Sequence, residues 1–558
     1  MNHIATLRAS TSSIPITPRF PAIGVEALAL LTSIFLSLAS NRAAWSHVLE
    51  DRAWDDPATW VFGACMFVAL TAFQFVPLAL VMTRRSARYV IAVVLVVSAF
   101  AGHFIETYNV FLDPGMLRNV LHTDVKEASE LCSTDLLLHM VWQAALPIAL
   151  LWRLRIVERP WRRALVQRAA AIAMAIALLA LALVVSFQDV AGIARNHREW
   201  RFLVTPSNVV YSLARAGSTK ARIAAAPLTP IGTDARLGPS WTGRTKPALV
   251  VIVVGETARA ANWGLNGYAR QTTPELAALD VVNFTDVTSC GTDTEASVPC
   301  MFSPGGLRDH DGARERTQES LLHVLQRAHL PVLWRDNQSG CKGVCTGLEL
   351  DQLDASTVAG LCEDARCFDE ILLHGLDERI QARKGNQVVV LHGLGSHGPA
   401  YYRRYPERFR RFTPTCDTGE LRKCTTEGIV NAYDNSLLYT DHVLGSAIRW
   451  LQSQASERDT ALIYLSDHGE SLGEHNLYLH GMPRSLAPKE QTHVPMVMWF
   501  SPGFASSFGV DTGCLRQQAL QPASHDNLFH TVLGLLDVQT RVHETRLDLM
   551  QACRSRQG

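Results

Sequence analysis

The chain has 558 residues, which is too long for one compact domain and suggests about two to four. Its 52 basic and 52 acidic side chains balance, so the charge gives no indication of nucleic-acid binding. The first 190 residues or so are rich in Ala, Leu and Val, whereas the remainder mixes polar and apolar residues. The sequence therefore predicts a membrane part followed by a soluble part.

Five apolar stretches in the first part are long enough to cross a bilayer, which requires about 20 mainly apolar residues. They lie at roughly 22–41, 59–82, 89–111, 134–152 and 165–187. Arginines crowd the loops at 83–88 and 153–168, and the other loops are poorer in basic residues. Because arginine-rich loops stay in the cytoplasm, we expect a cytoplasmic N-terminus and, after five spans, a C-terminal part on the outer side.

Two segments beside the spans carry polar patterns. Asn119, Thr123 and Glu127 are four residues apart, which on a helix would place them on one face, either simply solvated or used for binding. Residues 198–215 mix aromatic and basic side chains, as a helix at the membrane surface does, and a linker rich in Pro, Gly and Ala follows. The expected domains are a membrane domain at 1–190, a bridging helix and linker at 191–245, and a catalytic domain at 246–558.

Four apolar runs in the soluble part have the composition of buried strands, at 248–254, 387–391, 460–465 and 494–500. Runs rich in Val and Ile are typical of parallel strands, and the helical stretches between them indicate a doubly wound α/β sheet. Ligands of such sheets bind beyond the carboxyl ends of the strands. Four polar side chains follow the first three runs and form a candidate site for a catalytic zinc: Glu256, His397, Asp467 and His468.

A segment rich in hydroxyl groups lies between Cys290 and Cys300, and a helix is expected to begin within it. A phosphate attached there would lie near the positive end of the helix dipole. Thr292, Thr294 and Ser297 are all candidate nucleophiles, which a metal or a base would have to activate. The competing interpretation is that a threonine simply caps the helix.

Ten of the twelve cysteines follow residue 280. An even, dense set confined to the polar part predicts disulfides and an oxidising compartment. A zinc site that includes Cys341 and Cys345 is the rival interpretation, although no second close pair with histidines lies at finger-like spacing.

Longer motifs extend this pattern: Val254-Gly255-Glu256-Thr257, Cys290-Gly291-Thr292-Asp293-Thr294, Trp334-Arg335-Asp336-Asn337, Gly395-Ser396-His397-Gly398-Pro399 and Ser466-Asp467-His468-Gly469-Glu470. With these motifs and its five spans, the chain resembles the phosphoethanolamine transferases of Gram-negative bacteria, in particular the lipid A enzymes that confer polymyxin resistance. Their superfamily is that of alkaline phosphatases and sulfatases. The resemblance covers nearly the whole chain and implies a five-span α-helical membrane domain followed by an alkaline-phosphatase-like α/β domain.

The resemblance also implies roles for individual residues. Zinc would be held by Glu256, Thr294, Asp467 and His468, with one ion firmly bound and a second left open. Thr294 would be the nucleophile, and His397 and His480 would act on substrate or hold the second zinc. Five further residues match substrate contacts: Asn119, Thr123, Glu127, Ser339 and Lys342.

The resemblance favours disulfides between near neighbours in the sequence. The expected pairs are Cys290–Cys300, Cys341–Cys345, Cys362–Cys367 and Cys416–Cys424, and Cys514–Cys553 follows only by elimination.

The implied reaction moves phosphoethanolamine from phosphatidylethanolamine to a lipid A phosphate through a phosphoethanolamine-threonine intermediate, which lowers the negative charge of the cell surface and gives polymyxin resistance. The enzyme would be a monomer in the bacterial inner membrane, with its catalytic domain in the periplasm. A superfamily transferase with another acceptor, such as a periplasmic glucan, is the nearest alternative. A membrane-anchored binding or sensor domain is the alternative from another class, and it would need no metal-bound threonine.

Overall fold

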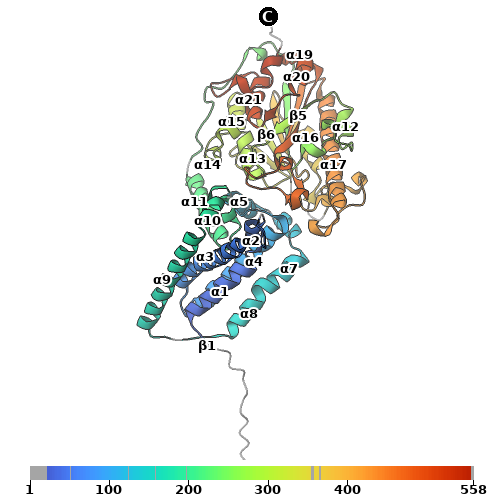
Figure 1. The fold of residues 1–558 in the computed structure, drawn as a ribbon. Helices are drawn as coiled ribbons and strands as arrows, with labels where there is room; N and C mark the ends of the chain where they lie inside the picture. Colours follow the sequence, from blue (N-terminus) through green and yellow to red (C-terminus); the bar gives the residue numbers. More distant parts are fainter. Residues whose placement is uncertain are drawn as a thin grey trace, which may run out of the picture. The chain divides into compact units, whose positions relative to one another are not determined.

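The computed structural model describes residues 22–554, except residues 51, 124, 158, 197, 226, 354–356 and 364–365. The chain divides into two compact units (Figure 1). The first unit comprises Met1–Phe100 and Leu138–Arg198, and the second comprises Ala101–Leu137 and Glu199–Gly558. The segment between the third and fourth expected spans thus belongs to the same unit as the soluble part. The domain limits expected near residues 190 and 245 stay predictions.

The first unit is helical. Among the described residues, four helices are long and apolar enough to cross a membrane: α3 (Pro57–Val81), α4 (Ala87–Tyr108), Thr134–Arg153, and α9 (Trp161–Val185). The third of these consists of α7 (Thr134–Met140), a π-helical turn (Val141–Ala145) and α8 (Leu146–Arg153). The first expected span is a pair, α1 (Val25–Ala39) and α2 (Arg42–Leu49), bent by 55°. By length and composition, the described residues therefore contain four candidate spans, or five if the bent pair counts as one.

Small side chains let the helices of the first unit approach one another closely. Ala29 of α1, Ala72 and Ala79 of α3, and Ala99 of α4 are all buried in its apolar core. Small residues at such interfaces favour helix association in lipid, where apolar surface alone gives no driving force. At the bend between α1 and α2, the amide of Asn41 donates a hydrogen bond to the carbonyl of Leu36 at 2.8 Å, which satisfies an acceptor at the helix end.

The row of Asn119, Thr123 and Glu127 does not lie on one helix. Helix α5 (Pro114–His122) ends where Thr123 turns to extended backbone, with φ −60° and ψ 128°, and α6 (Val125–Glu130) begins only after that break. The Thr123 hydroxyl donates to the carbonyl of Asn119 at 2.8 Å, an interaction that competes with continuing the helix. The expected single face is therefore wrong, and the side chain of Glu127 lies outside the described part of the chain.

The second unit is built on an eight-stranded sheet with the order β15-β5-β14-β11-β4-β10-β6-β7. The strands are β4 (Ala248–Gly255), β5 (Val282–Thr288), β6 (Val332–Asp336), β7 (Glu349–Gln352), β10 (Gln387–His392), β11 (Asp459–Ser466), β14 (His493–Phe500) and β15 (Ala523–Ser524). Strands β11, β4 and β10 run parallel, as expected, and β6 and β7, which the sequence did not predict, extend this parallel part; β14 runs antiparallel to both of its neighbours.

The antiparallel direction of β14 contradicts the expectation of a parallel strand and has a simple cause. A parallel return needs a crossover along the whole sheet, usually a helix. Between β11 and β14 the described helices are only short turns, the longest being α18 (Lys489–Thr492), and the chain re-enters the sheet at the edge where β11 left it. The segment between β11 and β14 therefore stays at the end of the sheet where β11 finishes, and its residues can contribute to a site there.

Helices cover both faces of the sheet (Figure 1). Along β4 the side chains alternate: residues 248, 250, 252 and 254 enter one apolar core, and residues 249, 251 and 253 enter the other. The first core includes α13 (Thr294–Met301), α15 (Leu321–Arg327), α19 (Pro502–Phe508), α20 (Thr512–Gln518) and α21 (Asp526–Leu535), and the second includes α16 (Leu376–Gln381) and α17 (Thr426–Gln454). Burial on both faces explains why β4 is apolar throughout.

Five disulfides close loops of the second unit. They join Cys290–Cys300, Cys341–Cys345, Cys362–Cys367, Cys416–Cys424 and Cys514–Cys553, which are the pairs expected from the sequence. The expected bridge contains a 3₁₀ turn (Arg198–Phe202) and α11 (Ser207–Ala225). The hydroxyl of Ser212 on α11 donates to the carbonyl of Leu112 at 2.9 Å, so this helix is tied to the segment that precedes α5.

Candidate active site

The carboxyl ends of β4 and β11 meet at one point of the sheet. The two strands pair in parallel up to Gly255 and Ser466, so the residues that follow, Glu256 on one strand and Asp467 and His468 on the other, converge. His468 Nε2 lies 3.3 Å from Glu256 Oε1 and 3.4 Å from Asp467 Oδ2, and all three side chains are buried. Strand pairing thus builds a compact group of two carboxylates and an imidazole.

Thr294 adds a hydroxyl to this group from a third element. It is the first residue of α13, which Asp293 caps by accepting a hydrogen bond from the amide of Ala296. Its Oγ1 lies 3.1 Å from Glu256 Oε2 and 3.4 Å from His468 Nε2. The hydroxyl is therefore held between Glu256 and His468 at the positive end of a helix.

The other two hydroxyl candidates are committed elsewhere. The hydroxyl of Thr292 donates to the carbonyl of Met482 at 2.6 Å, and that of Ser297 accepts from the amide of Gly291 at 3.0 Å. Of the three candidate hydroxyls, that of Thr294 contacts the carboxylate of Glu256 and the imidazole of His468. The geometry thus separates candidates that composition leaves equal.

Burial makes this group electrostatically costly. Burial, and then the negative charge of Glu256, raises the pKa of Asp467. Burial also disfavours ionisation of Glu256, but the hydrogen bond and charge of His468 outweigh it and hold the pKa of Glu256 well below its usual range. Asp467 Oδ2 is buried and makes no hydrogen bond. A buried carboxylate oxygen without a hydrogen-bond donor is an arrangement that a cation would stabilise.

Two further histidines border the group. The ring centroid of His480 lies 4.4 Å from that of His468 and 5.2 Å from that of His397. His480 Nδ1 lies 3.1 Å from the buried carboxylate of Glu470. Burial, and then the positive charges of His468 and His397, holds the pKa of His480 well below its usual range. The structure therefore places His480 beside His468 and His397 beside His480, with the carboxylate of Glu470 to orient His480.

Ser339 and Lys342 lie next to α13, the helix that begins with Thr294. Lys342 Nζ donates to the hydroxyl of Ser339 and lies 3.6 Å from Glu295 Oε1, the residue after Thr294. His122, at the end of α5, approaches the same oxygen at 3.3 Å. The substrate candidate Lys342 and His122, which the sequence did not single out, thus approach one buried carboxylate.

Several known proteins match this chain over most of its length. The family model "Phosphoethanolamine transferase EptA/EptB" matches residues 70–221, and the sulfatase model matches residues 248–538. Phosphoethanolamine transferase EptA of Escherichia coli K12 is 38% identical over 540 residues, which cover 96% of this chain and 98% of the relative. The chain belongs to the phosphoethanolamine transferase family.

Two more members of this family support the same assignment. Phosphatidylethanolamine transferase Mcr-1 of Escherichia coli is 37% identical over 86% of this chain and 88% of its own length. The solved structure of the integral membrane lipooligosaccharide phosphoethanolamine transferase A of Neisseria meningitidis superposes with a TM-score of 0.91 at 37% identity, covering 96% of this chain and 100% of that one. The likeness to these transferases therefore includes the helical first unit as well as the sheet.

Sequence reasoning missed several residues of this transferase site. Gln338 donates to Glu256 Oε2 at 3.2 Å, and Glu295 gathers His122, Lys342 and Arg316 around one carboxylate. His525 bridges the segments of the nucleophile and of the carboxylates. Adjacency to Thr294 could have indicated Glu295, whereas no local pattern marks His525.

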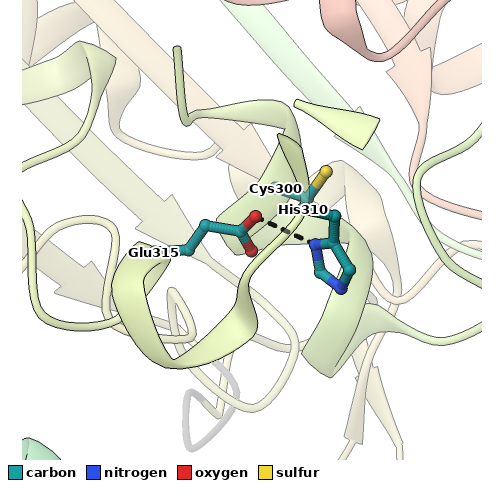
Figure 2. A group of neighbouring side chains, drawn as sticks. All are labelled: Cys300, His310 and Glu315. Carbon is teal, nitrogen blue, oxygen red and sulfur yellow. Dashed lines mark hydrogen bonds and ion pairs between the residues drawn. The ribbon is translucent and has the colours of Figure 1, made fainter. Parts of the chain in front are cut away.

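A second group of potential metal ligands in the transferase has a different explanation. Cys300, His310 and Glu315 lie close together, and Figure 2 shows His310 paired with Glu315, their Nδ1 and Oε1 atoms 2.9 Å apart. Cys300, however, forms the disulfide with Cys290, and a disulfide sulfur is not the thiolate that binds metal. This group is an ion pair beside a disulfide.

Proposed function

We propose that this transferase moves phosphoethanolamine from phosphatidylethanolamine to a phosphate of lipid A. The observation that carries the proposal is the position of Thr294, whose hydroxyl lies at the start of α13 within 3.1–3.4 Å of Glu256 and His468. Relatives named for phosphatidylethanolamine and for lipooligosaccharide support this donor and this acceptor. Phosphoethanolamine on lipid A would lower the negative charge of the cell surface and give polymyxin resistance.

Zinc is the cofactor we propose, held by Glu256, Thr294, Asp467 and His468. The residues fit this metal: His468 Nδ1 lies 2.9 Å from the carbonyl of Gly469, which can only accept, so this nitrogen carries the proton and Nε2 faces the carboxylates. Carboxylate oxygens and imidazole nitrogens are ligands of catalytic zinc. Asp467 Oδ2, which is buried without a hydrogen bond, is available for such a bond. Bound there, zinc supplies positive charge that activates a hydroxyl and offsets charge on phosphoryl oxygens.

The proposed reaction has two displacements at phosphorus. In the first, a bond forms between Thr294 Oγ1 and phosphorus while the bond from phosphorus to the diacylglycerol oxygen breaks, and the threonine proton ends on diacylglycerol. In the second, an oxygen of the lipid A phosphate bonds to phosphorus and Thr294 Oγ1 leaves with a proton. His480 packs against His468, a neighbour of Thr294, and His397 packs against His480; these two histidines are the groups that we propose carry the protons.

The remaining candidates bind substrate in this proposal. Lys342 and Ser339 would contact phosphoryl oxygens beside Glu295, and Asn119, Thr123 and Glu127 would contact the lipid headgroup. Both substrates are membrane lipids, so a catalytic domain tethered to apolar helices suits them. The arginine-rich loops favour an inner-membrane enzyme with the catalytic domain in the periplasm. The proposed enzyme is a monomer, and it holds one firmly bound zinc ion because the described residues contain one group of two carboxylates and an imidazole beside Thr294.

The experiment is mass spectrometry of lipid A from polymyxin-sensitive cells that produce either the wild-type chain or its Thr294→Ala variant. Wild-type cells should gain the mass of one phosphoethanolamine group on lipid A, and the variant should give none at equal protein level. Phosphoethanolamine found on a periplasmic glucan, with lipid A unmodified, would refute the acceptor but keep the transferase chemistry.

A further inference from the structure

A buried carboxylate anchors the segment that precedes α7. Glu130, the last residue of α6, has a side chain only 2% exposed and pairs with two arginines of the catalytic fold. Arg404 Nη2 lies 2.6 Å from Glu130 Oε2, and Arg366 Nη1 lies 3.0 Å from Oε1. Arg366 is beside Cys367, whose loop the disulfide with Cys362 closes. The carboxylate thus ties α6 to the two segments of the sheet domain that carry Arg366 and Arg404.

Arg404 connects this anchor to the active site. Its side chain is 1% exposed, and its Nε donates to the carbonyl of His397 at 2.5 Å while its two Nη atoms face Glu130. The planar guanidinium presents donors in a fixed fork, so the direction of one hydrogen bond sets the direction of the others. The amide of His397 is held separately, by the carbonyl of Leu394 at 3.3 Å. Hydrogen bonds therefore hold both backbone groups of His397, its N–H and its carbonyl.

We propose that Glu130 and Arg404 are positioning residues for His397, which transmit the placement of α6 to the imidazole that packs against His480. Neither residue touches the carboxylates or the nucleophile; they act through the backbone of His397. Glu127, one of the headgroup candidates, lies one turn before Glu130 on the same helix. The segment that receives the lipid headgroup and the histidine that serves the reaction are thus joined by a single arginine.

The inference rests on the role of His397 in the proposed function. A purely structural ion pair would stabilise the fold without affecting how His397 works. A positioning pair has a sharper consequence: its effect on rate should disappear once the imidazole is gone. Residues that act through one another show non-additive effects in a double-mutant cycle.

The test uses the full-length, zinc-loaded enzyme in detergent micelles containing phosphatidylethanolamine. The measured quantity is the rate of phosphoethanolamine adduct formation on the Thr294 peptide, for Arg404→Lys, His397→Ala and the double variant. Lysine keeps the charge but cannot donate to both the His397 carbonyl and Glu130. A displaced catalytic group costs about ten- to a hundredfold in rate, and we expect a loss of that order for Arg404→Lys.

The matched control is the neighbouring arginine. Arg403 Nη1 lies 4.0 Å from the same Glu130 oxygen that binds Arg366, but the Arg403 side chain is 46% exposed. Arg403→Lys should keep the wild-type rate within about twofold, since exposed pairs contribute little. Zinc content and thermal unfolding, measured for every variant, report whether Arg404→Lys is folded. Should it fail to fold, Glu130→Gln, which keeps the shape of the carboxylate, takes its place in the cycle.

The predicted result is that Arg404→Lys, or Glu130→Gln in its place, slows adduct formation in the wild-type background and adds no further loss to His397→Ala. Losses that multiply in the double variant would overturn the inference and leave the proposed function standing. A wild-type rate of adduct formation for Arg404→Lys would also overturn the inference and leave the proposed function standing. A wild-type rate for His397→Ala would instead remove the role of His397 from the proposed function, and the inference with it.

Discussion

His525 holds together the two halves of the active site. Its Nδ1 accepts a hydrogen bond from the amide of Cys290 at 3.1 Å, and its Nε2 lies 2.9 Å from the carbonyl of Ser466, to which it donates. Cys290 begins the loop that leads to Thr294, and Ser466 precedes Asp467. The imidazole is fully buried, and burial lowers the pKa of His525 to about 3. A neutral ring with its proton on Nε2 therefore bridges the segment that leads to Thr294 and the segment that leads to Asp467.

Replacing this ring by phenylalanine keeps a planar aromatic side chain, slightly larger than imidazole, and removes both hydrogen bonds. The amide of Cys290 and the carbonyl of Ser466 would then be buried without partners, at about 1–3 kcal/mol for each unsatisfied group. We expect His525→Phe to lower the free energy of unfolding by about 2–6 kcal/mol. His525→Asn is the matched control, because its side-chain oxygen lies where Nδ1 accepts from Cys290, and it should lose about half as much.

The same ring makes stability depend on pH with a definite sign. An unfolded histidine titrates near pH 6.5, so below that pH the unfolded chain binds a proton that the folded ring refuses. The contribution of neutral His525 is complete above about pH 6.5 and is lost as the pH falls toward 3. Between pH 7 and pH 5 this loss amounts to about 2 kcal/mol, at about 1.4 kcal/mol per pKa unit. His525→Phe has no such proton to bind.

The assay is thermal unfolding of the full-length wild-type and variant proteins in detergent at pH 7 and pH 5, with zinc present throughout. The Tm gap between the wild type and His525→Phe should be large at pH 7 and narrower at pH 5. Equal Tm values at pH 7 would show that the bridge does not stabilise the site. A gap that widens on acidification would contradict a histidine held neutral by burial.

Three further outcomes follow from other parts of the site. Gly395→Ala should slow transfer about tenfold or more, because residue 395 has φ +51° and an added Cβ would collide with the carbonyl oxygen of Glu256; turnover measurements on lipid vesicles check this. Cys514→Ser combined with Cys553→Ser should lower the free energy of unfolding by about 2–4 kcal/mol in a denaturant titration. Removing metal with a chelator should abolish transfer and lower Tm, and zinc but not magnesium should restore both.

The sequence predicts the parts of the sheet that are buried on both faces. Strands β4, β10 and β11 are continuous apolar runs, and the residues after β4 and β11 form the ligand group. Strand β5 alternates buried and partly exposed residues and carries Asn, Asp and Thr, so no apolar run marks it. The direction of β14 depends on the lack of a long crossover helix, which its own composition cannot reveal.

The site was predictable only where it follows from strand ends. Residue type leaves Thr292, Thr294 and Ser297 equal as nucleophiles, and the tertiary partners of each hydroxyl separate them. His525 and Arg404 form hydrogen bonds with backbone groups of other segments, those of Cys290 and His397. Such contacts leave no periodic signal in the sequence. The break of α5 at Thr123 arises from a local side-chain hydrogen bond that four-residue spacing does not show.

The nucleophile is the central claim, and the most direct measurement is mass spectrometry of the peptide that contains Cys290 and Cys300 after the enzyme has been incubated with phosphatidylethanolamine alone. The account predicts a phosphoethanolamine group on Thr294 of the wild-type protein and no adduct on the Thr294→Ala variant, which should remain folded. An adduct on Thr292 or Ser297, or full transfer activity in Thr294→Ala, would contradict it.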